Sequence, residues 1–391
     1  MMINLFDDSA WQSLRPLSFT RPVADLRVGI LTIAEKWKKY LNAEAGFLTI
    51  AYLAEKYPAN NGAEWFINGS ICPDRSLVDA ICSLKIGESL KKGNLLIAYR
   101  TNTGELLTPD SIVQFDAKNY SESFIRIEFP EDIFKFNHIE LTKDFELITH
   151  GRISANLGAT NTFLGENFFA EEGAIAECST FNSLAGPVYL GKNTEVWEGC
   201  HIRGSFALCH NSQVKMGARI YGQTTVGPYS KVAGEMNNVN IWGYSSKGHE
   251  GYLGNAVLGQ WCNIGADSNN SNLKNNYSDV KVWEYAVRDF RNTKLQFCGL
   301  IMADHAKCGI NTMFNTGTVV GVSANVFGPG FPPNFIPDFS WGGPHGFESY
   351  KLEKMFQTAA RVYERRNSEF NQIEKDILIK VFNDTEAYRH F

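Results

Sequence analysis

The stretch that decides the fold runs from residue 184 to residue 232 and reads LAGPVYLGKNTEVWEGCHIRGSFALCHNSQVKMGARIYGQTTVGPYSKV. A branched aliphatic residue recurs in it at every sixth position: Leu184, Leu190, Val196, Ile202, Leu208, Val214, Ile220, Val226 and Val232. A sustained step of six fits neither the helical period of 3.6 nor the strand period of 2. It is typical of a coil made of short flat strands, in which one aliphatic residue per strand points inward.

The same step returns further along the chain. It recurs at Leu258 and Ile264, and again at Met302, Cys308, Phe314, Val320 and Val326. The sequence therefore predicts a left-handed parallel β-helix of hexapeptide repeats over residues 146–345. Each coil of such a solenoid contacts only its neighbours. We therefore predict that the interruptions at 236–252 and 268–297 are loops that project from an intact stack.

Different patterns flank the repeats. Residues 1–145 combine apolar strand-like runs with helical spacing, which predicts an α/β domain. The expected strands are Phe47–Ile50, Trp65–Ile67 and Leu95–Tyr99, and the expected helices are Ile30–Tyr40 and Leu77–Leu84. In the C-terminal segment, 346–391, the spacing predicts two helices over Tyr350–Arg366 and Phe370–Phe382, packed on the β-helix or on a neighbouring subunit.

Composition limits the class of protein. A chain of 391 residues with 13% aromatic residues is long and apolar enough for two or three folded domains, which excludes disorder. The net charge of -5 disfavours nucleic-acid binding. We find no apolar run of about 20 residues, no secretory signal in MMINLFDDSAW, and eight cysteines without a CxxC pair. We therefore expect a cytoplasmic protein without membrane spans, structural disulfides or a zinc site; His201, His210 and His249 lack the close spacing that zinc needs.

One local motif carries chemistry. It reads SKGHEGYLG over Ser246–Gly254, and NIGA (263–266) and SNL (271–273) follow it. Imidazole titrates near neutral pH, which makes His249 a candidate general base. Asparagine amides can hold a substrate or a developing oxyanion. The alternative interpretation is a histidine that merely caps a surface loop.

The stretch from about 185 to 330 resembles the acetyltransferase domain of a bifunctional family, glucosamine-1-phosphate N-acetyltransferase / N-acetylglucosamine-1-phosphate uridyltransferase. The family carries S-K-x-G-H-x-x-Y-L-G-D, then N-I-G-A-G and T-x-x-x-N-Y. The resemblance implies that His249 is the catalytic base and that Tyr252 contacts the sugar phosphate. It also implies that Asn263 and Asn272 belong to the substrate site, with Asn272 near the reacting atoms, and that Arg219 binds the phosphate.

The resemblance also implies a cosubstrate and an assembly. Acetyl-CoA is expected along Ala266, Gly309, Ile310 and Gly328, and the family forms homotrimers. The reaction would be acetyl transfer to an amino-sugar 1-phosphate in nucleotide-sugar biosynthesis. Two departures concern charge and contacts: the family's lysine after Glu235-Met236 is Asn237 here, and its tyrosine after the second asparagine is Leu273.

The N-terminal LRPLSFTRP (14–22) resembles the R-L-x-P-L-T-x-x-x-P-K stretch of sugar-1-phosphate nucleotidyltransferases. The family's G-x-G loop is replaced by DDSAW (7–11), its lysine by Val23, and the domain is shorter. Asp8, Arg15 and Arg21 are candidate nucleotide contacts, and structural ion pairs are an equally good interpretation of the arginines. Mg²⁺ is expected only if this domain is active. Two alternative functions stay open: nucleotidyl transfer with the β-helix as a trimer scaffold, and sugar-nucleotide binding without catalysis.

Overall fold

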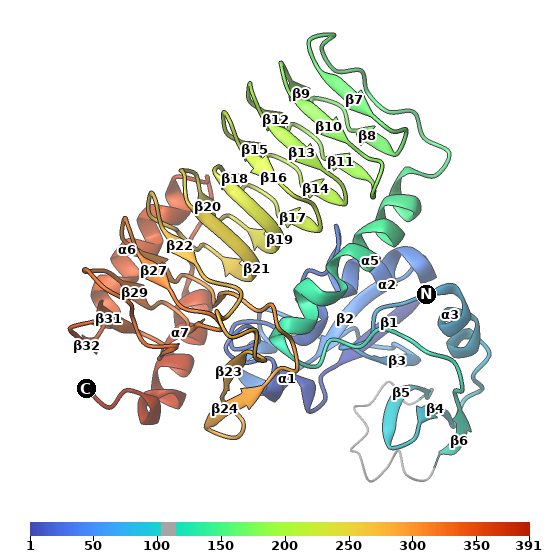
Figure 1. Cartoon of the computed structure of the whole chain (residues 1–391). Coiled ribbons are helices and arrows are strands. Elements are labelled where there is room, and N and C mark those ends of the chain that lie inside the picture. Colours follow the sequence, from blue (N-terminus) through green and yellow to red (C-terminus); the bar gives the residue numbers. More distant parts are fainter. Residues whose placement is uncertain (103–114) are drawn as a thin grey trace. The chain divides into compact units, whose positions relative to one another are not determined.

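The computed structural model describes residues 1–102 and 115–391, and the chain divides into two compact units (Figure 1). Unit 1 comprises Met1–Leu14, Thr20–Leu26 and Leu31–Phe129. Unit 2 comprises Arg15–Phe19, Arg27–Ile30 and Pro130–Phe391. The two units are described separately.

Unit 1 is an α/β domain around one mixed sheet, as predicted. Its strands lie in the order β2-β1-β3-β5-β4-β6; β1 pairs in parallel with β2 and β3, and β5 is antiparallel to β3 and β4. The strands are β1 (Met2–Phe6), β2 (Glu44–Leu48), β3 (Trp65–Asn68), β4 (Glu88–Lys92), β5 (Leu95–Arg100) and β6 (Asp116–Asn119). The helices are α1 (Ala10–Ser13), α2 (Ile33–Leu41) and α3 (Arg75–Cys82), with 3₁₀ turns η1 (Val23–Asp25) and η2 (Ala51–Leu53).

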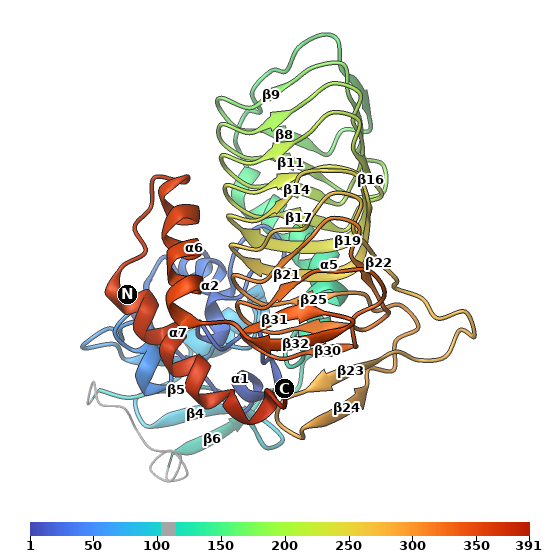
Figure 2. The same ribbon diagram turned by 90° about the vertical axis from the view of Figure 1, so that its left-hand side faces the viewer.

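Unit 2 contains a parallel β-helix with three walls, which confirms the fold predicted from the repeat (Figures 1 and 2). Wall one holds β7 (Thr162–Leu164), β10 (Thr180–Asn182), β13 (His201–Arg203), β16 (Arg219–Ile220), β22 (Asn269–Asn270) and β27 (Met313–Phe314). Wall two holds β8 (Phe168–Ala170), β11 (Val188–Leu190), β14 (Phe206–Leu208), β17 (Thr224–Val226), β25 (Ile301–Met302), β28 (Val319–Val320) and β30 (Phe335–Ile336). Wall three holds β9 (Ile175–Ala176), β12 (Glu195–Val196), β15 (Gln213–Val214), β18 (Lys231–Val232), β20 (Ser246–Lys247), β26 (Lys307–Cys308), β29 (Asn325–Val326) and β31 (Ser340–Gly343), and β32 (Gly346–Ser349) pairs with β31. Two nine-residue strands, β19 (Glu235–Gly243) and β21 (Tyr252–Gln260), run through walls one and two.

The six-residue step places its aliphatic side chains inside the coil, with one exception. Every residue from Leu190 to Val232 in the first series is at most 2% exposed, and the later series are buried as well. Leu184 is 74% exposed, so its predicted inward position is wrong. It lies in the connection between β10 and β11, and Phe181, which is 1% exposed and in register with Ile202, occupies the inward position of wall one in that coil.

The first predicted interruption, 236–252, is not a projecting loop. The coil continues through it, because Val226 pairs with Ile241 and Val232 pairs with Lys247 across a step of 15 residues. In the regular coils just before it the step is 18 residues, as from Val196 to Val214 and from Val214 to Val232. Three residues are lost from this coil, so the six-residue pattern disappears from the sequence although the wall remains intact.

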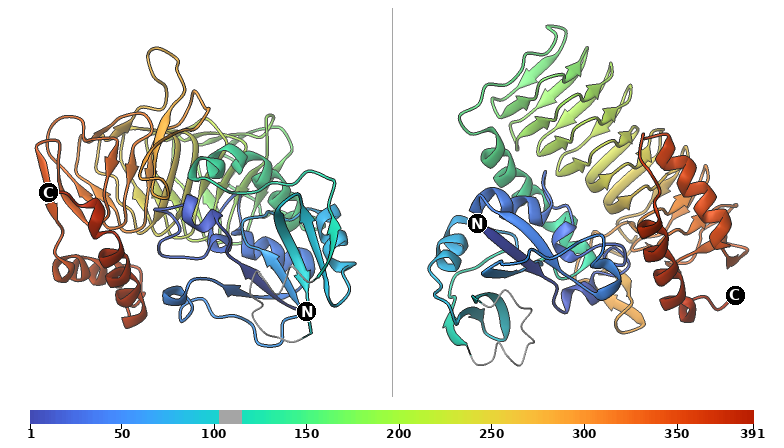
Figure 3. Two further views of the ribbon diagram at one scale, coloured as in Figure 1. Left: turned by 90° about the horizontal axis from the view of Figure 1, so that it is seen from below. Right: turned by 180° about the vertical axis from the view of Figure 1, so that it is seen from behind.

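The second interruption projects as predicted. After β22 the chain leaves the stack over 271–297 and forms an antiparallel hairpin of β23 (Lys281–Glu284) and β24 (Asp289–Asn292) (Figure 3). Cys298 then donates its backbone N–H to the Asn272 carbonyl oxygen at 2.9 Å, which closes the excursion. The coil resumes at β25.

Helices cover part of the stack. Helix α5 (Pro130–Thr149) packs on wall two, where Asn240 donates to Asn137 Oδ1 at 2.7 Å. The two predicted C-terminal helices are α6 (Leu352–Glu364) and α7 (Gln372–Asp384), followed by the 3₁₀ turn η3 (Glu386–Tyr388). Tyr363 of α6 stacks on Trp261 of the β-helix with ring centroids 3.8 Å apart. The C-terminal segment therefore packs on the β-helix of its own chain, one of the two predicted arrangements.

Candidate functional site

His249 lies in a four-residue turn, 248–251, that joins wall three to wall one between β20 and β21. The side chains of His249 and Glu250 are exposed. Gly251 has φ +114, and a Cβ there would lie 2.1 Å from the Ser268 carbonyl oxygen. Glycine is therefore required for the turn to fit against the next coil.

The other predicted donor-site residues follow His249 along the same edge of the stack. The turn containing Ala266 comes next, because Asp267 donates its backbone N–H to the Glu250 carbonyl oxygen at 3.0 Å. The turn containing Gly309 and Ile310 follows, because Asn311 donates to the Ala266 carbonyl oxygen at 2.8 Å. The next turn of wall three contains Gly328, where a Cβ would meet open space. We call this line of turns the histidine edge (residues 248–251, 265–268, 309–312 and 327–330).

Arg219 lies on wall one, beside the histidine edge. Its guanidinium pairs with Glu250 at 3.0 Å and approaches Glu235 of the next coil at 3.8 Å. The hydrogen bond that Arg219 donates to Glu250 raises the pKa of Arg219 above its usual value. All three side chains are at least one third exposed, so the charges stay accessible from solution.

Tyr252 and Asn272 are brought together by the fold. Tyr252 follows Glu235 in register on wall one, and its hydroxyl accepts a hydrogen bond from Asn272 Nδ2 at 3.0 Å. The second amide hydrogen of Asn272 goes to Asn255 Oδ1 at 2.8 Å. Burial raises the pKa of Tyr252, and the bond from Asn272 partly opposes that shift. Both amide hydrogens of Asn272 are therefore used in hydrogen bonds. This arrangement allows Asn272 to hold the Tyr252 side chain in place.

Asn263 lies on the other side of the histidine edge. It occupies an exposed position on wall three, bridged to Ser246 in the preceding coil and to Lys307 in the following coil. Arg219, Tyr252 and Asn272 therefore lie on one side of the edge, and Asn263 on the other. A substrate that contacts both groups within one chain must span the edge.

In unit 1, Asp8 and Arg21 are engaged in internal contacts. Asp8 accepts hydrogen bonds from the Ala10 backbone, from Asn68 and from Arg126, all within 2.9 Å. Arg21 is 2% exposed and pairs with Asp25 at 2.9 Å. The Arg21 contact matches the alternative interpretation of the arginines as structural ion pairs. Arg15, in unit 2, lies over the Phe19 ring at 5.3 Å.

Two buried ionisable groups were not singled out from the sequence. Burial raises the pKa of Asp7 to about 7, although Thr49 and the Val23 backbone donate to its carboxylate. Lys247 is 2% exposed and occupies an inward position of the coil directly beneath the His249 turn. The hydropathy pattern did not mark Lys247, because the shortened coil removes the six-residue step there.

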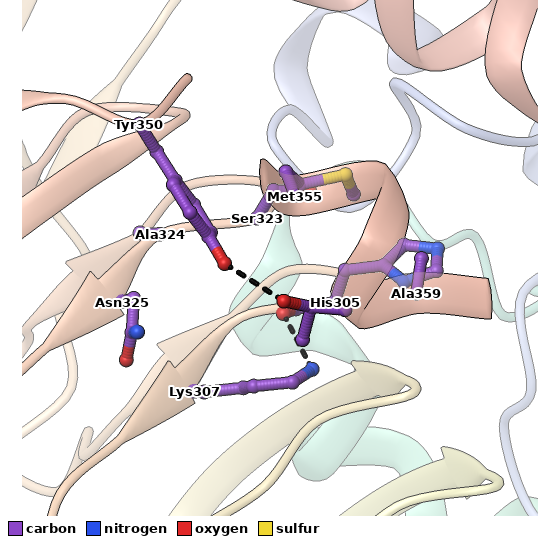
Figure 4. A pocket seen from close by; sticks show the side chains of 9 residues that line it. His305, Lys307, Ser323, Ala324, Asn325, Tyr350, Met355 and Ala359 are labelled. Atoms are coloured by element: carbon purple, nitrogen blue, oxygen red, sulfur yellow. Dashed lines mark hydrogen bonds between the residues drawn. The ribbon is translucent and has the colours of Figure 1, made fainter. Parts of the chain in front are cut away.

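Two small pockets accompany these features in unit 2. One adjoins the site and is lined by Lys247, Tyr252, Leu253, Ile264, Ser268, Asn269, Asn270, Leu300 and Phe314. The other lies between wall three and helix α6, where Lys307 and Asn325 face Tyr350 (Figure 4); Thr358 also lines it. None of the predicted site residues except Tyr252 lines either pocket.

Within 1–102 and 115–391, no group of three or more His, Cys, Asp or Glu side chains is arranged to hold a metal ion. Over the same ranges, no helix is both long and apolar enough to cross a bilayer.

Comparisons with known proteins support the resemblance drawn from the motifs. The family model described as "Sugar nucleotidyl transferase" matches residues 3–153. The "Bifunctional protein GlmU" of Methanocaldococcus jannaschii is 33% identical over 73 residues, which is 19% of this chain and 17% of the archaeal protein. The chain thus matches less than a fifth of that relative's length. Over residues 3–153 the family model agrees with the expected class of protein, a transferase.

Solved acyltransferase structures are similar at a lower level. A UDP-N-acetylglucosamine acyltransferase of Francisella novicida is 12% identical with a TM-score of 0.27, covering 59% of this chain and 91% of that one. The corresponding Arabidopsis enzyme is 16% identical with a TM-score of 0.24, covering 60% and 91%. A Bacillus cereus N-acyltransferase, AntD, solved with dTDP and coenzyme A, is 11% identical with a TM-score of 0.21, covering 52% and 91%. The architecture is defined by the strand register described above.

Proposed function

We propose that the chain is an acetyl-CoA-dependent N-acetyltransferase that acts on an amino-sugar 1-phosphate. The observation that carries the proposal is the histidine edge, where an exposed imidazole is followed by the backbone turns expected to bind the acyl donor. Arg219 and Tyr252 lie on the adjoining wall, where a sugar phosphate can reach them. The short match to a bifunctional relative supports the same assignment.

Each residue of the site has a proposed role in the reaction. His249 takes a proton from the 2-amino group of the sugar as its nitrogen attacks the thioester carbonyl. A carbon–nitrogen bond forms and the carbon–sulfur bond breaks, so that coenzyme A leaves as a thiol after protonation of its sulfur. The backbone N–H of Ala266, in the turn next to His249, is the candidate donor to the oxyanion. Asn272 holds the Tyr252 hydroxyl, and Arg219 binds the phosphate.

The acyl donor and the assembly belong to the same proposal. Apolar side chains border the histidine edge: Met216 is 62% exposed, Ile310 71% and Phe327 39%. Such a strip suits the pantetheine arm of coenzyme A or a neighbouring subunit of a homotrimer. A cytoplasmic location agrees with the use of acetyl-CoA.

A second activity, sugar-1-phosphate nucleotidyl transfer with Mg²⁺, is favoured for unit 1 by the family match over 3–153. The proposed contacts in this unit are Asp8 and Arg21. Because Asp8 and Arg21 already hold internal partners, a nucleotide must displace Arg126 or Asp25 to use them. Pyrophosphate release from a nucleoside triphosphate, lost in Asp8→Asn, tests this activity.

The test of the main proposal is acetyl transfer from acetyl-CoA to glucosamine 1-phosphate, measured as free thiol. His249→Ala should lower kcat by about 100- to 10,000-fold, the usual contribution of a general base. His201→Ala is the matched control, since His201 is an exposed histidine on wall one, in register with Arg219 one coil away. Equal rates for wild type and His249→Ala would exclude His249 as the base. Ligand binding without turnover would favour the non-catalytic alternative.

A further inference from the structure

A lysine occupies the interior of the β-helix beneath the His249 turn. Lys247 occupies the inward position of wall three that Val214 and Val232 occupy in the two preceding coils. The repeat pattern predicts an aliphatic side chain at this position. Only 2% of the Lys247 surface is exposed. Taking an ammonium group out of water costs free energy unless it gains strong partners. The partner of this lysine is therefore informative.

The ammonium reaches the turn from inside. Lys247 Nζ donates to the His249 carbonyl oxygen at 2.7 Å, the length expected of a charge-assisted bond. Gly234, in the preceding coil, lies next to this hydrogen bond. A Cβ at position 234 would be 2.9 Å from the His249 carbonyl oxygen and 3.0 Å from Lys247 Nζ. Glycine at 234 leaves the room that the lysine and the carbonyl share.

The turn is held from outside as well. Glu250 pairs with Arg219, and Asp267 of the next coil donates to the Glu250 carbonyl oxygen at 3.0 Å. These contacts fix the residue after His249. The bond from Lys247 fixes the His249 carbonyl itself and hence the peptide plane that sets the direction of the imidazole.

The charges around Lys247 keep it protonated near neutral pH. Burial lowers its pKa to about 8. Glu250, Asp267 and Cys308 face it and oppose that shift, whereas Arg219 adds to it. Above pH 8 the amine becomes neutral and its bond to the carbonyl weakens.

We propose that Lys247 is a positioning residue for His249: its buried ammonium holds the turn from the core of the coil. The proposal rests on the acetyltransferase function proposed above. A displacement of about 1 Å at a reacting group can cost about 100-fold in rate. Loss of Lys247 should therefore lower kcat and leave the donor site, on later turns, intact.

The test replaces the ammonium with a thioether of similar length, Lys247→Met, for which the adjoining pocket leaves space. The matched control is Lys307→Met. Lys307 is partly buried and also donates to backbone carbonyl oxygens, to that of Trp261 at 3.1 Å and to that of His305 at 3.1 Å. Figure 4 shows the bond to His305. Burial lowers its pKa as well. Its bonds lie at a different edge of the stack from His249.

Two measurements are made on each full-length variant. We expect wild type to lose kcat above pH 8, and we expect Lys247→Met to remove that loss. We also expect Lys247→Met to lower kcat about 10- to 100-fold with the KM for acetyl-CoA within about twofold. Amide hydrogen exchange over 248–251 should become about tenfold faster. Lys307→Met should match wild type in both. Lys247→Gln, which keeps a donor without charge, should fall between wild type and Lys247→Met.

The outcomes separate the two proposals. Faster exchange in the turn of a protein that shows no acetyl transfer at all would overturn the proposed function and leave Lys247 as the support of the turn. Unchanged exchange and unchanged kcat in a folded Lys247→Met or Lys247→Gln protein would overturn the positioning role. If neither variant folds, a wild-type kcat that stays level from pH 7 to 9.5 overturns it.

Discussion

Arg219 is the proposed phosphate-binding residue, and its guanidinium already contacts the carboxylates of Glu250 and Glu235. The lysine that the resembled family places nearby is Asn237 here, so the site has one cation fewer. A sugar phosphate must therefore compete with Glu250 for Arg219. Exposed ion pairs are worth about 0–1 kcal/mol, so the competition is weak and reversible.

Glu250→Gln should therefore lower the KM for glucosamine 1-phosphate by up to about fivefold, the equivalent of that energy, with kcat within twofold. Steady-state kinetics at low ionic strength measures this effect, which should shrink as salt is added. Glu198→Gln is the control, since Glu198 is an exposed glutamate in the corresponding turn three coils earlier. A higher KM in Glu250→Gln would show that this carboxylate helps to bind the substrate.

At the level of elements, helix α6 is held to the β-helix through a stack of aromatic rings. Tyr363 is 5% exposed and stacks on Trp261, with His305 and Phe370 at 6.0 and 5.3 Å between ring centroids. Removal of a buried aromatic ring typically costs about 3–5 kcal/mol.

We therefore expect Tyr363→Ala to increase amide exchange in α6 by at least tenfold and to lower the thermal stability of unit 2. Tyr277→Ala is the control, because Tyr277 is 65% exposed and its loss should leave both measurements unchanged. Unaltered exchange in α6 would mean that α7 and the connecting segments hold the helix without the aromatic stack.

The elements also show what the sequence could predict. The step of six marked the regular coils correctly, since apolar burial at one position per strand leaves a direct trace in sequence. It failed at Leu184, where a connection between strands happens to match the phase, and at 236–252, where the coil is three residues shorter. Pairing at a step of 15 would have placed Ile241 and Lys247 inward.

Contacts between residues far apart in the sequence could be predicted less well. The proximity of Tyr252 and Asn272 could be expected only from a family resemblance, because it depends on how two coils stack. The internal partners of Asp8 and Arg21 are set by the tertiary fold of unit 1, so a local motif could not decide between a nucleotide contact and an ion pair. The spacing of aliphatic residues in the sequence predicts the strands, whereas the residues of the site are brought together only when the coils stack.

Each unit contains a carboxyl group whose pKa is raised by burial. The stability of both units therefore depends on pH in the same direction. Burial raises the pKa of Asp7 in unit 1 to about 7 and that of Asp338 in unit 2 to about 6. The Asp338 carboxylate accepts hydrogen bonds from Tyr285 and from the Val322 backbone, which oppose the shift without cancelling it. An unfolded aspartate has a pKa of about 3.9.

Because the folded pKa is the higher one, the folded state binds the proton more tightly. The resulting stabilisation is complete below about pH 4 and is lost as the pH rises through about 6 in unit 2 and about 7 in unit 1. We expect calorimetry to show lower unfolding temperatures at pH 8 than at pH 5. Asp338→Asn should flatten the dependence of the unit 2 transition, and Asp7→Asn that of unit 1, whereas the exposed Asp116→Asn should change neither. A transition that keeps its full slope in the matching variant would assign the proton to another group of that unit.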